Sequence, residues 1–132
     1  MLGWWIIIST LSPEEYDRTD RESRRATTLA NWETNAFGGL DWIDKLIEEG
    51  KATQLSENGY PNRYTAMARD VLPILENGGI EPPRKGPMVI GGDEGEEYVQ
   101  PPGWMGKVEK NPSLIAACSP DQRLTIEAWD QS

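Results

Sequence analysis

The sequence contains no histidine and a single cysteine, Cys118. Without histidine the chain cannot form a Ser-His-Asp triad, a Cys-His pair or an imidazole general base. One cysteine cannot complete a zinc site made of Cys and His ligands, and it cannot form a disulfide within the chain. The glycine-rich loops that bind phosphate groups at the two common spacings are also missing. We therefore expect a protein without a cofactor or metal that is not an enzyme.

Long apolar runs are missing as well. The most apolar stretch, residues 4–8, is too short to span a bilayer and follows no basic leader. It is typical of a buried strand. A lone cysteine suits a reducing compartment, so we expect a cytoplasmic protein. Cys118 itself ends an apolar run and has no basic neighbour, which favours a buried small side chain over a reactive thiol.

The sequence has fewer basic residues than acidic ones. The chain has 13 Lys and Arg against 22 Asp and Glu, a net charge of −9. This balance disfavours direct binding to nucleic acid, where Lys and Arg neutralise phosphates, and it disfavours an anionic membrane. It is compatible with a basic protein partner, because opposite potentials speed encounter. Solubility alone is the alternative explanation.

What the sequence does contain indicates a folded domain with long connections. Its 132 residues are the usual size of one domain, so we expect a single domain over 1–132. Six tryptophans supply large buried areas, while 13 Gly and 10 Pro favour irregular segments. The longest such segment is a Pro- and Gly-rich loop over about 78–106.

Local signals predict the first elements. Residues 4–9 are expected to form a central strand. Ser12, Pro13 and Glu15 form a capping box with proline at the first helical position, and the helix is expected to run to about Phe37. A second helix is expected from about Leu40 to Glu49.

Later signals alternate between strand and helix. A hairpin is expected over 51–55 and 62–68, followed by a short helix over 71–76 that Asp70 would cap. Two short strands are expected at 88–90 and 107–109. A helix opened by Asn111 and Pro112 is expected over 111–118, and a final strand over 123–129. The fold class predicted is α+β: a mostly antiparallel sheet of four or five strands with helices packed on one face. The strands at 4–9 and 123–129 are expected to be neighbours in its centre.

Two acidic groups are candidate contact surfaces for a basic partner. One lies on the polar side of the second helix, and the other is the loop that follows Gly91 and Gly92, with the aromatic residues after it. The expected partner-binding residues are Asp41, Asp44, Glu48, Glu49, Asp93, Glu94, Glu96, Glu97, Tyr98 and Trp104. For the loop, a solvated acidic surface and a metal or catalytic site remain as alternatives, although it does not match a calcium loop. Residues 58–64 are interpreted as a hairpin tip, with an anion or sugar site as the alternative.

Charge and missing chemistry together predict a small acidic protein-binding domain. We expect an inhibitor or adaptor that acts on a basic, nucleic-acid-handling protein, such as an anti-CRISPR-type inhibitor from a phage or mobile element. The alternatives are an immunity protein against a toxin nuclease, a phage structural subunit and a carboxylate-dependent enzyme. No direct contact with nucleic acid or membrane is expected.

Overall fold

The computed structural model of the chain describes residues 3–36, 38–81 and 105–131. The strands are β1 (Gly3–Ser9), β2 (Thr28–Asn35), β3 (Ala52–Glu57), β4 (Asn62–Met67), β5 (Glu109–Lys110) and β6 (Arg123–Asp130). The helices are α1 (Pro13–Asp17), α2 (Arg21–Ala26), α3 (Asp41–Glu48), α4 (Ala68–Glu76) and α5 (Pro112–Ala117).

The strands form one antiparallel sheet in the order β3-β4-β6-β1-β2-β5. The predicted α+β class is confirmed, but the sheet has six strands rather than four or five. The additional strand is β2, which lies in a segment that was expected to be helical. The two apolar end strands are neighbours in the centre, as predicted, with Ile6 opposite Ala128 and Ile8 opposite Ile126.

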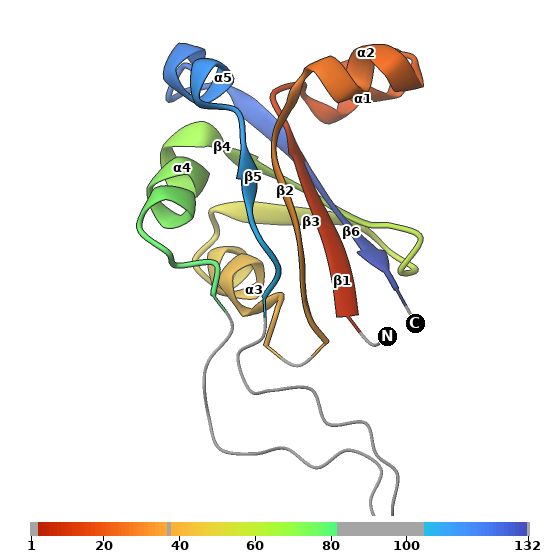
Figure 1. Ribbon diagram of the computed structural model, residues 1–132, viewed down its shortest axis with the longest axis vertical. Coiled ribbons are helices and arrows are strands. Elements are labelled where there is room, and N and C mark those ends of the chain that lie inside the picture. Colours follow the sequence, from red (N-terminus) through yellow and green to blue (C-terminus); the bar gives the residue numbers. More distant parts are fainter. Residues whose placement is uncertain (1–2, 37, 82–104, 132) are drawn as a thin grey trace, which may run out of the picture.

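One face of the sheet carries the hydrophobic core. Alternate residues of the central strands, such as Ile6, Ile8 and Ile126, are buried there because side chains of a strand point to opposite faces in turn. Helices α3 and α4 cover this face, as Figure 1 shows. Their apolar sides contribute residues such as Trp42 and Val71 to the same core. The prediction of helices packed on one face is therefore confirmed for these two helices.

The opposite face, which we call the open face, is covered at one end only. Helices α1 and α2 lie at that end, at the top of Figure 1. The rest of the open face presents alternate residues of β1, β2 and β6, including Trp5 and Trp129. This arrangement leaves a hollow between the helical end and the remaining length of the strands.

The long helix expected from Pro13 to Phe37 is wrong. The chain makes the short helices α1 and α2, then turns and returns as β2 along the whole of β1. The capping box that predicted its start is real, since the Ser12 hydroxyl accepts from the Glu15 amide at 3.3 Å. Asp20 then starts a new helix by accepting from the Ser23 amide at 2.8 Å. Beyond Thr27, pairing with β1 outweighs the helical preference of the sequence.

Most of the remaining predicted elements are confirmed. Helix α3, the β3–β4 hairpin, β5, α5 with its Asn111 cap and β6 lie within a few residues of their expected positions. Helix α4 begins at Ala68, three residues earlier than expected, so Asp70 lies inside it and does not cap it. The short strand expected at 88–90 lies outside the described residues.

In the part of the chain that the structure describes, no helix is both long enough and apolar enough to cross a membrane.

Candidate binding groove

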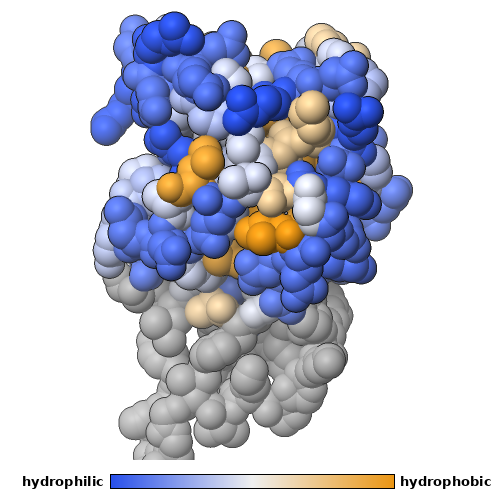
Figure 2. All heavy atoms as spheres, turned by 180° about the vertical axis from the view of Figure 1, so that it is seen from behind, coloured by the Kyte–Doolittle hydropathy of each residue, from blue (hydrophilic) through white to orange (hydrophobic). Residues whose placement is uncertain are grey.

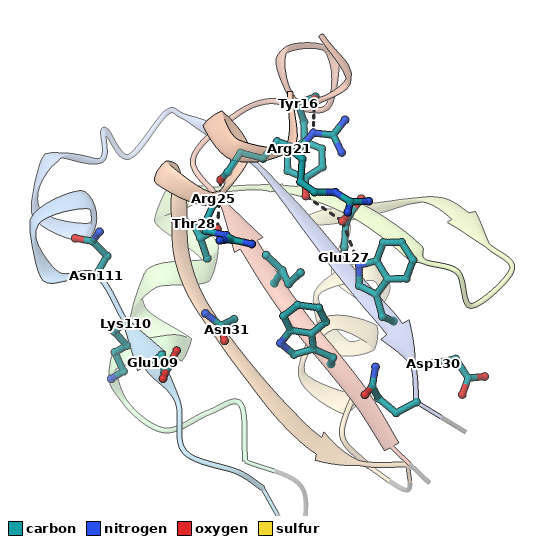
Figure 3. A pocket seen from close by; sticks show the side chains of 15 residues that line it. Tyr16, Arg21, Arg25, Thr28, Asn31, Glu109, Lys110, Asn111, Glu127 and Asp130 are labelled. Atoms are coloured by element: carbon teal, nitrogen blue, oxygen red, sulfur yellow. Dashed lines mark hydrogen bonds between the residues drawn. The ribbon is translucent and has the colours of Figure 1, made fainter. Parts of the chain in front are cut away.

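A groove of about 940 Å³ lies on the open face of the sheet, below α1 and α2 (Figure 3). Its floor is formed by β1, β2 and β6, and α2 and β5 form two of its walls. The register of the sheet assembles the floor from residues far apart in the sequence. Trp5 lies opposite Trp129, and Ile7 lies between Asn31 and Glu127. The groove thus combines an apolar, aromatic floor with polar walls, which is the usual composition of a binding site.

Trp5 is the most exposed part of the floor. Its side chain is 40% exposed, although it belongs to a strand at the centre of the sheet. Among the described residues, Leu55 and Tyr60 are the other large hydrophobic side chains that remain exposed, and both belong to the β3–β4 hairpin. An aromatic side chain that stays open to solvent beside a second tryptophan is a common anchor in protein interfaces.

Glu127 is a buried carboxylate at the edge of this groove, with only 3% of its surface exposed. Both of its oxygens are engaged. Arg63 donates to Oε2 through Nη2 at 2.9 Å and through Nε at 3.2 Å. Tyr16 Oη donates to Oε1 at 3.0 Å, and Trp129 Nε1 donates to the same atom at 3.3 Å. A carboxylate with this many donors is a structural anion, since its lone pairs are occupied and its charge is neutralised.

The same cluster anchors α1 to the sheet. Asp17, which follows Tyr16, accepts from Nη1 of Arg63 at 2.7 Å, so the arginine bridges α1 and β6. The guanidinium of Arg24 lies 4.2 Å from the centre of the Tyr16 ring, and its Nε donates to the Tyr16 carbonyl at 2.8 Å. Burial, and then the neighbouring Glu127 carboxylate, raise the pKa of Tyr16 to about 12. Its phenol therefore keeps its proton and acts as a donor.

Arg21 and Arg25 differ from Arg24 in that their charges are uncommitted. Both belong to α2, are exposed and line the groove. Neither makes a hydrogen bond or ion pair within residues 3–36, 38–81 and 105–131. Figure 3 shows them at the end of the groove next to α1 and α2. This end consequently offers guanidinium groups that a ligand can bind without breaking a contact among the described residues.

Negative charge is placed elsewhere in the groove. Glu109 lies opposite Asn31 at the β5 wall, with Lys110 beside it. Asp130 lies opposite Trp4, toward the far end of the strands (Figure 3). The groove is therefore polarised along the strands, positive beside α2 and mixed or negative away from it.

The acidic surface predicted on the second helix exists, but it lies apart from the groove. Asp41, Asp44, Glu48 and Glu49 are all exposed on or just after α3, and none of them lines the groove. Partial burial, and then Asp41 and Glu48, raise the pKa of Asp44. Glu49 lies 3.4 Å from Lys51. The other predicted contact residues, Asp93, Glu94, Glu96, Glu97, Tyr98 and Trp104, lie outside the described residues.

Other candidate sites from the sequence receive structural explanations. Arg63, which carried the anion-binding alternative for the 58–64 segment, is held by Glu127 and Asp17 instead. Cys118 is half-buried, and burial raises the pKa of its thiol, which makes it a weaker nucleophile at neutral pH. Within the described residues, no three Cys, Asp or Glu side chains are grouped so that they could hold a metal ion.

Sequence reasoning missed the groove for two reasons. Trp5, Ile7, Glu127 and Trp129 alternate with core residues, but only the strand register shows that they meet on one face. Arg21 and Arg25 were placed within a long helix rather than in a short arm beside the sheet. The available signal was the alternation of Trp5 and Ile7 with Ile6 and Ile8, which indicates a second, separate face.

The side of the molecule opposite to the view of Figure 1 also carries hydrophobic residues. Figure 2 shows its hydrophobic residues gathered near the middle and surrounded by hydrophilic ones, outside the part drawn in grey. The α1–α2 end of this side is strongly hydrophilic.

Comparisons with protein-family models, with curated proteins and with solved structures found no match for this chain.

Proposed function

We propose that the protein is a protein-binding domain, acting as an inhibitor or adaptor, and that the groove on the open face holds a segment of its partner. The observation that carries the proposal is the pair of Trp5 and Trp129 on the groove floor, with Trp5 40% exposed. Aromatic side chains bury a large area at little cost in side-chain entropy, and they dominate the binding energy of many interfaces.

The surroundings of this pair favour binding over catalysis. The best-placed carboxylate, Glu127, is neutralised by Arg63 and receives two further donors, so it is poorly suited to act as a general base. The phenol of Tyr16 is a fixed donor to Glu127 rather than a group poised to release a proton. What the groove offers a ligand is shape, aromatic surface and uncommitted arginines.

The α3 face supports a second candidate contact, with a basic partner. The pKa of Asp44 is raised in part by Asp41 and Glu48, so these carboxylates repel one another in the free protein. Glu48 and Glu49 also lie at the negative end of the helix dipole. A basic surface would relieve both effects. This contact suits inhibition of a nucleic-acid-handling protein, as an anti-CRISPR-type inhibitor from a phage or mobile element would require.

The groove is tested by affinity capture with matched surface variants. The tagged protein, the Trp5→Ser variant and the Leu55→Ser variant are incubated with lysate of the native host, and captured proteins are identified by mass spectrometry. Leu55 is a suitable control because it is 47% exposed, on an edge strand outside the groove. Equal removal of exposed apolar surface is thereby compared inside and outside the groove.

The proposal predicts a protein that the wild type and Leu55→Ser retain and Trp5→Ser loses. Capture that depends on neither residue but is lost in an Asp44→Lys/Glu48→Lys variant would favour the α3 face instead. If no protein is captured, or if Trp5→Ser retains the partner fully, the groove is not the binding site.

A further inference from the structure

We infer that the groove selects an acidic, extended peptide segment: its carboxylates meet Arg21 and Arg25, and an apolar side chain farther along rests on Trp5 and Trp129. This inference rests on the proposed function and specifies the chemistry of the partner segment. It follows from the placement of charge along the groove and from the spacing that the strands impose.

The arginines provide the charge complementarity. Arg21 and Arg25 are exposed, and neither has a bonded partner among the described residues. Arg24 already stacks on Tyr16 and bonds its carbonyl, which holds the same helix in place. Guanidinium groups bind carboxylates through paired hydrogen bonds, which are stronger than bonds between neutral groups. Two free guanidiniums on one fixed helix therefore favour a ligand with clustered carboxylates at this end.

The strand geometry sets the spacing of the ligand. Thr28 follows α2 closely and lies opposite Ser9, so the end of α2 that carries Arg25 is level with Ser9. Trp5 lies four residues away along the same strand. At roughly 3.3 Å per residue this separation is about 13 Å, which an extended peptide covers in about four residues. An acidic pair and an apolar side chain about four positions apart would fill both parts of the groove.

The remaining charges favour a peptide over a nucleic acid. A nucleic-acid strand carries negative charge evenly along its length, and its affinity depends on neutralising several phosphates. Beyond the arginines, the groove presents Glu109 and Asp130 against the single Lys110, and the chain as a whole carries −9. These charges would repel successive phosphates. A peptide can confine its negative charge to one end and remain neutral where it passes Glu109.

The test uses defined probes with the full-length protein. Fluorescein-labelled hexapeptides consist of two glutamates, three Gly or Ser spacers and a phenylalanine, in both chain directions. A peptide with lysines in place of the glutamates and a labelled dT8 oligonucleotide serve as comparison probes. Fluorescence anisotropy is measured at low and at 300 mM salt. The variants are Arg21→Gln/Arg25→Gln, Trp5→Ser and, as a control, Arg69→Gln, whose exposed side chain pairs with Asp121 away from the groove.

The inference predicts binding of the acidic peptide in one or both directions and weaker binding at high salt. Affinity should fall about 10-fold or more in the double arginine variant and in Trp5→Ser, and stay unchanged in Arg69→Gln. Preference for dT8 or for the lysine peptide, or affinity that is equal in all variants, would overturn it. If a captured partner depends on Trp5 but not on Arg21 and Arg25, the groove remains the binding site and only the acidic chemistry of the ligand is wrong.

Discussion

Tyr16 Oη donates a hydrogen bond of 3.0 Å to the carboxylate of Glu127, and this contact joins α1 to the centre of the sheet. Arg63 completes the connection, because it contacts both Glu127 and Asp17. The helical arm of α1 and α2 is thereby fixed against the open face. This one cluster therefore holds in place the wall of the groove that carries the arginines.

Replacing Glu127 with Gln should destabilise the protein by about 2–4 kcal/mol. Removing one partner of a buried ion pair weakens the compensation of the other charge, and the cost stays below the largest known values because Arg63 is partly exposed and keeps its pair with Asp17. Urea denaturation measures the change. Glu14→Gln is the control, since its pair with Arg123 is exposed and 3.5 Å long, and we expect about 0.5 kcal/mol or less. Equal losses in both variants would show that the cluster does not anchor α1.

Stability should fall between pH 10 and 12 because of Tyr16. Its pKa is raised from 10.0 to about 12 in the folded protein, so the unfolded chain releases this proton first. The contribution is complete below pH 10 and is lost as the pH rises toward 12. Denaturation at several pH values should give a shallower decline for Tyr16→Phe. Tyr60→Phe, at a 63% exposed position, should keep the slope of the wild type. An unchanged slope in Tyr16→Phe would contradict the assignment.

Asp44→Asn should stabilise the protein slightly at neutral pH, by about a few tenths of a kcal/mol at most, because solvent screens this exposed carboxylate. The raised pKa of Asp44 means that its ionised form is disfavoured in the folded state, so this cost appears as the pH rises through that pKa. Thermal unfolding at pH 7 and pH 3.5 measures the effect, which should vanish at the lower pH. If the α3 face binds a basic partner, the same variant should bind more weakly. A loss of stability at pH 7 would show that the carboxylate has an internal role.

Local patterns in the sequence predicted much of the fold. Capping residues Ser12 and Asn111 marked true helix starts, and the alternation of Leu124 and Ile126 marked a true strand. The error at β2 arose because Trp32 was read as part of a helix, whereas its burial depends on pairing with β1. Pairing between distant segments has no local signature, so the capping box at Ser12 was extended too far.

The candidate site was harder to predict than the fold. The net charge indicated acidic contact residues, and three of these are exposed on α3 with Glu49 just after it. The groove instead depends on which residues share a face across strands, such as Trp5 with Trp129, and on an arginine arm held by Tyr16. The net charge of the chain does not indicate this local positive charge, because Arg21 and Arg25 hardly change a net charge of −9.

Site-specific photo-cross-linking to the captured partner tests the groove most directly. A photoreactive residue replaces Lys110, at the groove wall, or Lys45, an exposed residue of α3 outside the groove. Both substitutions remove one surface lysine, so the two proteins differ mainly in the position of the probe. The account predicts a strong cross-link from position 110, which excess acidic peptide abolishes. A cross-link from position 45 with none from position 110 would contradict it.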